Sequence, residues 1–209
     1  FKANYYEKNN EILVADSCLK VAEKIFGSSN SRRIELSGKM IVNSTRMELY
    51  SKLGMVEKAL ELSSVNYKAC EELKDTNNLI IILLKRRALY DRIGKKNKLS
   101  EVNIQIEKLL SLHKNELIEM KYLTNRALSE GNEGDKKSAI RDLLKALEIA
   151  KRINFEPTLI LNNLYIFSEP KETMKWLRLA QYHARKNKNK RGLNLILGNM
   201  ANEYKKQGQ

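Results

Sequence analysis

The side chains that most often catalyse reactions or bind metals are few in this sequence and stand apart from one another. His113 and His183, the two histidines, belong to no cluster of Cys, Asp or Glu with metal-ligand spacing. Glu71 and Glu72 are adjacent, so a helix places them on neighbouring faces, whereas general acid–base catalysis needs carboxyls that converge in a dry cleft. The sequence has no phosphate loop, nucleophile elbow, HExxH motif or dinucleotide fingerprint. We therefore expect no enzyme activity, metal or cofactor.

Two further motifs are better explained by structure than by chemistry. Cys18 and Cys70 form no CxxC pair, and each lies in a helical apolar pattern, which predicts buried thiols. Asn43-Ser44-Thr45 matches a glycosylation acceptor, but we expect it in the middle of a helix and interpret it as a chance match.

Composition and sequence pattern favour an all-α protein with anionic partners, which include nucleic acid, acidic peptides and anionic lipid. The 209 residues carry 39 basic and 25 acidic side chains, a formal net charge of +14, which favours anionic partners. Sustained period-two alternation and hairpin turns are lacking, so no strands are expected.

No apolar run approaches the roughly 20 residues of a membrane span. The run "LIIILL" at 79–84 is followed at once by basic residues and predicts a buried helix face. A cytoplasmic location is favoured. Because the sequence opens on Phe1 without an initiator Met, an exported protein with its signal peptide removed is the alternative.

The elements that position the polar residues are repeated helices. The stretch "EGDKKSAIRDLLKALEIAKR" at 133–152 has Gly134 and Asp135 before apolar residues at helical spacing, among them Leu143 and Leu144. Gly54, Gly94 and Gly134 are 40 residues apart, and each stands between two predicted helices. Gly208 fits the same register, and a further copy fits with its turn near Ser168.

Each copy is predicted to be a helix-turn-helix hairpin. A hairpin of this length cannot bury both of its apolar faces alone, so neighbouring hairpins must stack. Glycine permits a turn geometry that a residue with a Cβ atom resists, and a small alanine in the second helix allows close approach of the first. The second helix of the added copy runs through Trp176, Leu177, Ala180 and Ala184.

The spacing Tyr50, Gly54, Ala59 resembles the second half of the tetratricopeptide repeat. The resemblance covers essentially the whole chain, although most spacings are 40 rather than 34 residues and the Trp-Leu-Gly that opens each family unit is missing. It implies a right-handed α-solenoid of about five hairpins, formed by residues 1–209 as a single domain. It further implies a likeness to the sensor regions of bacterial regulators. Because residues 1–10 and 192–208 each look like part of an unpaired hairpin, we expect a fragment of a longer protein.

In tetratricopeptide arrays the first helix of each hairpin lines a concave groove, so the resemblance directs attention to the inner positions of these helices. The groove candidates are Ser44, Lys85, Lys121, Asn125, Thr158, Asn162, Tyr165, Asn199 and Asn202. Helix interiors disfavour asparagine, and its amide can bind a peptide backbone at both C=O and N–H. The asparagines therefore suggest an extended peptide, with simple exposure to water as the alternative. Thr158 stands where the family's carboxylate clamp needs a lysine, so that clamp is not expected.

Two basic clusters, 85–98 and 185–191, offer a different function. They form a candidate phosphate-contacting stripe for nucleic acid. We prefer the explanation that cations gather at helix C-termini, because few aromatic residues lie between the charges.

The sequence therefore predicts a scaffold that binds a protein or peptide, as the sensor or adaptor region of a larger regulatory protein. The alternatives are a nucleic-acid-binding module and a homo-oligomer that packs end to end.

Overall fold

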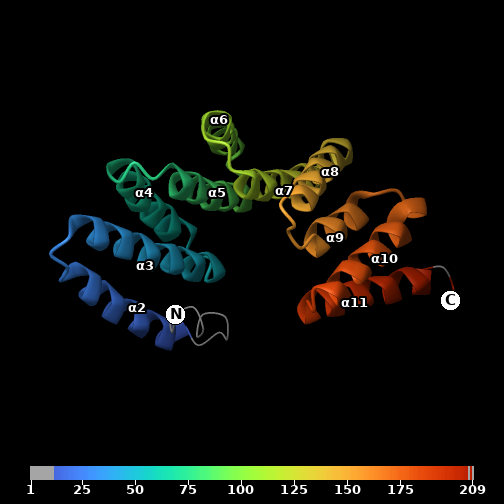
Figure 1. Cartoon of the computed structure of the whole chain (residues 1–209), viewed down its shortest axis with the longest axis horizontal. Coiled ribbons are helices and arrows are strands. Elements are labelled where there is room, and N and C mark those ends of the chain that lie inside the picture. Colours follow the sequence, from blue (N-terminus) through green and yellow to red (C-terminus); the bar gives the residue numbers. More distant parts are fainter. Residues whose placement is uncertain (1–11, 207, 209) are drawn as a thin grey trace. The chain divides into compact units, whose positions relative to one another are not determined.

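The computed structural model describes residues 12–206 and Gly208, and within them it is entirely helical (Figure 1). The helices are α2 (Ile12–Gly27), α3 (Arg32–Lys52), α4 (Val56–Glu72), α5 (Thr76–Arg92), α6 (Lys96–Leu112), α7 (Glu116–Asn132), α8 (Lys136–Arg152), α9 (Thr158–Phe167), α10 (Pro170–Lys186) and α11 (Lys190–Lys206). The predicted all-α class is confirmed.

The helices divide into two compact units, residues 1–113 with α2 to α6 and residues 114–209 with α7 to α11. Within each unit every helix packs against the next along the chain, so α3–α4, α5–α6, α7–α8 and α9–α10 form hairpins. In the second unit α9 also contacts α7 and α11. Stacked hairpins are therefore confirmed. One continuous right-handed domain over 1–209 stays a prediction, and the predicted helix tail at 1–10 lies outside the described residues.

Left-handed turn residues join the helices, as the glycine spacing predicts. Gly54, Gly94, Gly134 and Gly208 have φ of 76°, 66°, 99° and 74°. A residue with a Cβ atom is strained in this region, so glycine at these places fixes where each turn forms. The turns that lead out of α4, α8 and α10 use Lys74, Asn154 and Lys188 at φ of 53–54°. Only Asn154 among these three carries a sequence signal for that conformation.

The core forms where the apolar patterns predict it. Leu143, Ala146 and Leu177 are completely buried in one cluster of the second unit, although Leu144 is 39% exposed and so lies outside it. In the run at 79–84, Ile80 and Leu83 are fully buried. The thiol of Cys70 is buried and its pKa is raised to about 11, chiefly by that burial, while Cys18 is half-buried.

An asparagine completes the packing of α4 against α3. Asn66 is fully buried, and its side chain accepts a hydrogen bond from Asn43 at 3.0 Å. It donates to the carbonyl oxygen of Met40 at 3.0 Å and to the hydroxyl of Ser44 at 3.2 Å. Because the Asn43 amide is buried in the middle of α3, it is unsuited to glycosylation, as expected.

Asn66→Ala is expected to lower the free energy of unfolding by about 2 kcal/mol, since it removes the acceptor of the buried Asn43 amide and the hydrogen bonds to the Met40 carbonyl oxygen and the Ser44 hydroxyl. Chemical denaturation followed by circular dichroism measures the change. Asn194→Ala on exposed α11 surface is the control and should change stability by less than about 0.5 kcal/mol. Equal effects of the two substitutions would contradict the role given to Asn66.

Candidate ligand-binding hollows on the first helices

We call α3, α5, α7, α9 and α11 the first helices, because each of them ends at a predicted hairpin turn. Side chains join successive first helices in both units. Lys85 on α5 forms an ion pair with Glu48 on α3 at 2.7 Å, and Asn199 on α11 donates to Asn162 on α9 at 2.7 Å. Both pairs are separated by 37 residues.

The two pairs occupy the same place in the repeat. Glu48 and Asn162 lie six residues before the turn positions Gly54 and Ser168, and Lys85 and Asn199 lie nine residues before Gly94 and Gly208. The sequence placed Lys85, Asn162 and Asn199 among the groove candidates but gave no indication that they pair. An ion pair in one unit and an amide pair in the other therefore perform the same lateral bridging.

In the first unit a hollow of about 360 Å³ lies between α3 and α5. Its lining consists of Ser37, Met40, Ile41, Ser44, Thr45, Glu48, Asn78, Ile81, Ile82 and Lys85. Met40 and Ile82 are 7% and 2% exposed, whereas Ile41 is 61% exposed. The hollow therefore combines an apolar surface with charged and hydroxyl groups. The structure brings two of the predicted candidates, Ser44 and Lys85, together here.

The polar groups of this hollow are positioned by neighbouring helices. Lys85 donates to Glu48 and, at 3.4 Å, to the carbonyl oxygen of Ser44. The Ser44 hydroxyl accepts from the amide of Asn66 on α4. Such fixed donors and acceptors beside apolar surface suit a peptide, whose backbone is polar and whose side chains supply apolar groups.

A second hollow, of about 330 Å³, lies among α9, α10 and α11 in the other unit. It is lined by Tyr165, Ile166, Ser168, Pro170, Thr173, Glu203 and Lys206. Of the predicted candidates only Tyr165 belongs to it.

Glu203 is the residue of this second hollow that sequence reasoning missed. Its carboxylate accepts from Lys206 at 2.6 Å, from the Tyr165 hydroxyl at 3.2 Å and from the Thr173 hydroxyl at 3.4 Å. The hydrogen bond from Lys206 is the main cause that lowers the pKa of Glu203. Burial, followed by the Glu203 charge, raises the pKa of Tyr165. Glu203 is only 7% exposed, and nothing in the sequence indicates this burial except the helical spacing to Lys206.

One candidate residue needs correction. Thr158 is completely buried and its hydroxyl donates to Glu156, so it faces no groove. Thr158 is the first residue of α9, and both its backbone N–H and its hydroxyl donate to Glu156 before the helix. Asn162 is 5% exposed and its oxygen is already bonded to Asn199, which leaves it little contact with solvent.

The remaining candidates are on accessible helix surface. Lys121 and Asn125 are exposed on α7, and Asn202 is exposed on α11. None of these three lines either of the two hollows.

The arginines of the first basic cluster, residues 85–98, bridge neighbouring helices. The sequence had suggested a different reason for the cluster, the attraction of cations to helix C-termini. Arg86 donates to Ser63 and Ser64 on α4, Arg87 is buried and donates to Asn103 on α6, and Arg92 donates to the backbone of Ser51 on α3. These arginines bridge neighbouring helices, because the long guanidinium side chain reaches groups that a short polar side chain cannot.

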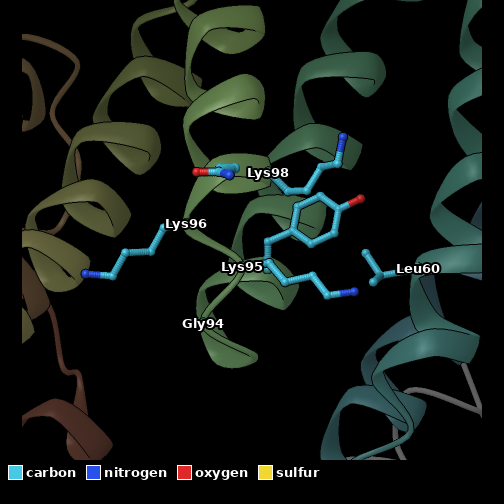
Figure 2. Close-up of a pocket in the computed structure, with 7 residues that line it drawn as sticks. Leu60, Gly94, Lys95, Lys96 and Lys98 are labelled. Atoms are coloured by element: carbon cyan, nitrogen blue, oxygen red, sulfur yellow. The ribbon is translucent and has the colours of Figure 1, made fainter.

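The lysines of the same cluster line a more open hollow of about 680 Å³ at the turn into α6 (Figure 2). In Figure 2 Lys95 extends towards Leu60 of α4 and Lys98 extends upward on the same side, while Lys96 points to the opposite side. Lys98 is also paired with Glu101 at 2.9 Å. A phosphate-binding site would require the three lysines to converge on one point, and they do not.

Other kinds of site find no support in the described part of the chain. No group of three His, Cys, Asp or Glu side chains there is arranged to hold a metal ion. None of the described helices has the length and apolar character needed to cross a bilayer.

Comparisons with known proteins show the fold alone. No protein-family model and no curated protein matches the sequence. Among solved structures, the crystal structure of BtubC (BKLC) from P. vanneervenii is similar, with a TM-score of 0.64 and 15% sequence identity over 92% of this chain and 90% of that chain. The similarity extends over nearly all of both chains, and the helical-repeat architecture is thus shared with a known protein.

Glu203→Gln is expected to lower the melting temperature at pH 7 by about 3 °C, because the ion pair with Lys206 is lost. The pKa of Glu203 is lower in the folded chain than in the unfolded chain, so its stabilisation is present above the ordinary Glu pKa of about 4.3 and is lost as the pH falls through the folded value. The difference between the two proteins should therefore shrink towards about pH 3. Thermal melts across this range measure it, with exposed Glu148→Gln as the control. A difference independent of pH would contradict this assignment.

Proposed function

We propose that this chain is a tetratricopeptide-like scaffold that binds a peptide or an extended protein segment on its first helices. The observation that carries the proposal is the hollow between α3 and α5. There Ile41, 61% exposed, stands beside the buried Met40 and the Lys85–Glu48 ion pair. In this proposal an apolar side chain of the peptide packs against Ile41 and Met40. The backbone of the peptide forms hydrogen bonds with Ser44 and Lys85.

The structure favours a peptide over a small molecule in this hollow. Lys85 and Glu48 neutralise one another, so the site presents no net charge to select a small ion. The hollow opens along the surface of two helices and does not enclose a ligand, whereas small-molecule sites usually bury most of their ligand. Within the first unit an extended ligand crosses two successive first helices, α3 and α5, which the Lys85–Glu48 ion pair joins.

A role as the sensor or adaptor region of a larger regulator is part of the same proposal. It rests on the resemblance to the sensor regions of bacterial regulators and on the absence of a candidate catalytic centre in the described residues. In such a region the bound peptide is the signal, and the helical repeat transmits its presence to a partner domain.

Ile41→Glu tests the site, because it places a charge where an apolar ligand side chain is expected. Peptides are first selected from a random phage-displayed library on the intact chain, and their affinities are then measured by fluorescence anisotropy. We expect Ile41→Glu to weaken binding at least about tenfold, the loss of one buried apolar contact with added desolvation.

The matched control is Ile104→Glu on α6, where the isoleucine is similarly exposed at 66%. It should leave affinity within about twofold. Circular dichroism confirms that both variants keep their helices. If the selection yields no peptide, or if Ile41→Glu binds all selected peptides as well as the control does, the proposed site is wrong.

Nucleic acid is the second candidate, and the net charge of +14 together with the exposed cluster at 185–191 favours it. Phosphate contacts make affinity fall by roughly one logarithmic unit per logarithmic unit of salt for each phosphate neutralised. Titration of a fluorescent oligonucleotide at several salt concentrations tests this. Absence of binding at about 50 mM salt excludes the nucleic-acid function.

A further inference from the structure

The outer faces of the second helices α4, α6, α8 and α10 can be compared residue by residue, because each of these helices is 17 residues long. In all four of them the residues at positions 2, 6, 9, 13, 16 and 17 of the helix are exposed. At about 3.6 residues per turn these positions lie on one side of the helix, opposite its buried side. We call this side the outer face.

The outer face of α10 is strongly basic. It consists of Lys171, Lys175, Arg178, Tyr182, Arg185 and Lys186, which we call the α10 strip. The same positions of α4 hold Glu57, Glu61, Ser64, Lys68, Glu71 and Glu72. Five residues are basic on α10, whereas four are acidic and one is basic on α4. An exposed position on a second helix therefore does not by itself select for a basic residue.

The attraction of cations to helix C-termini does not explain the α10 strip as a whole. That explanation applies to Arg185 and Lys186, which lie in the last turn of α10. Lys171 lies in the first turn, where the helix dipole disfavours a cation, and Lys190 and Arg191 likewise begin α11. Basic residues at unfavourable as well as favourable places indicate a surface that attracts an anion.

Most cations of the α10 strip are free to bind a partner. Lys171, Arg178 and Arg185 are exposed and form no ion pair with any residue that the structure describes. Lys175 is paired only loosely, with its ammonium nitrogen 3.6 Å from a carboxylate oxygen of Glu172. The arginines of the α10 strip thus differ from those of the first basic cluster, which bridge neighbouring helices.

Tyr182 places an aromatic ring among these cations. It is 58% exposed and lies one helical turn from both Arg178 and Arg185. Its ring makes an edge-to-face contact with the ring of His183, with the centroids 5.3 Å apart, which restrains its orientation. The α10 strip therefore combines cations that can contact phosphates with a ring on which a base can stack.

We propose that the α10 strip binds single-stranded nucleic acid, with phosphates on its lysines and arginines and a base stacked on Tyr182. From Lys171 to Arg185 the strip extends about 21 Å, which matches about six nucleotides at the roughly 3.4 Å spacing of a stacked strand. A duplex keeps its bases stacked inside and offers none to Tyr182. The proposal rests on the second candidate function, nucleic-acid binding, and gives that function a surface and a type of strand.

An anionic membrane fits the α10 strip less well. Helices that lie on a bilayer combine basic residues with a wide apolar face that enters the lipid. The apolar side of α10 is buried, with Leu177 and Ala180 completely covered, and the outer face offers a single aromatic ring. Nucleic acid is therefore the better partner for this surface.

Charge reversal on the strip tests the proposal with the intact chain. The probe is a fluorescein-labelled oligothymidine strand, and fluorescence anisotropy gives its Kd at several salt concentrations. The double variant Arg178→Glu, Arg185→Glu is expected to bind at least about tenfold more weakly at about 50 mM salt. The slope of log affinity against log salt should become shallower by about 1.4, since two phosphate contacts are lost at about 0.7 each.

The matched control is the double variant Lys68→Glu, Lys108→Glu, at position 13 on the outer faces of α4 and α6. It changes the net charge by the same amount, so a difference between the two double variants reports the surface and not the total charge. The control should bind within about threefold of the unmodified chain. Circular dichroism checks that both double variants keep their helices.

Tyr182→Ala tests the base contact separately. It is expected to weaken binding of the single strand at least about fivefold, whereas Tyr182→Phe, which keeps the ring, should bind within about twofold. A duplex of the same strand with oligoadenine should bind Tyr182→Ala as well as it binds the unmodified chain.

Failure of the nucleic-acid function and failure of the α10 strip are distinguishable. If the unmodified chain binds neither strand nor duplex at about 50 mM salt, both the function and the strip are wrong, whether or not the chain binds phosphatidylserine vesicles. If it binds the single strand and the two double variants are equally weakened, the function stands and the strip is wrong. If Tyr182→Ala has no effect, or weakens duplex and single strand alike, no base stacks on Tyr182.

Discussion

The structure depends on the fact that no helix in it can cover its own apolar face. Ala59 of α4 shows this most simply, because it is completely buried in a cluster with Met47 of α3 and Leu89 of α5. A second helix is thus covered from two sides, by the first helix of its own hairpin and by the next one. A small side chain at this place lets both neighbours approach, and a larger one would separate them. The same demand explains why neighbouring hairpins stack within each unit.

Apolar packing alone would let the helices slide along one another, and in each of three hairpins a polar pair with at least one buried member favours one alignment. Asn43 bonds to Asn66 between α3 and α4, and Arg87 bonds to Asn103 between α5 and α6. Between α7 and α8, Arg126 bonds to the buried Asp142 at 2.5 Å. The hydrogen bond to Asp142 is the main cause that raises the pKa of the Arg126 guanidinium. A shifted register would leave these groups buried and unpaired, which costs more than the bonds themselves contribute.

The functional surface follows from this arrangement. The first helices carry polar and apolar side chains on the sides that their second helices do not cover. There Glu48–Lys85 and Asn162–Asn199 join one first helix to the next. Such bridges leave a hollow with both kinds of surface between α3 and α5. In the second unit the bridge is neutral and the charge lies one turn further along, at Glu203.

The sequence by itself determined the helices, their turns and much of the core. The glycines at 54, 94, 134 and 208 mark the turns, because a left-handed backbone is strained for other residues. The apolar spacing identified buried residues such as Leu143 and Leu177. The turn conformation and the apolar spacing are both local properties of the sequence. The candidate sites were predicted less well. Ser44, Lys85 and Tyr165 line hollows, but Thr158 is buried, and the carboxylate of Glu203 was not foreseen. Which polar side chain meets which partner depends on the lateral offset between helices about 40 residues apart in sequence, and only the packing of one helix on the next sets that offset.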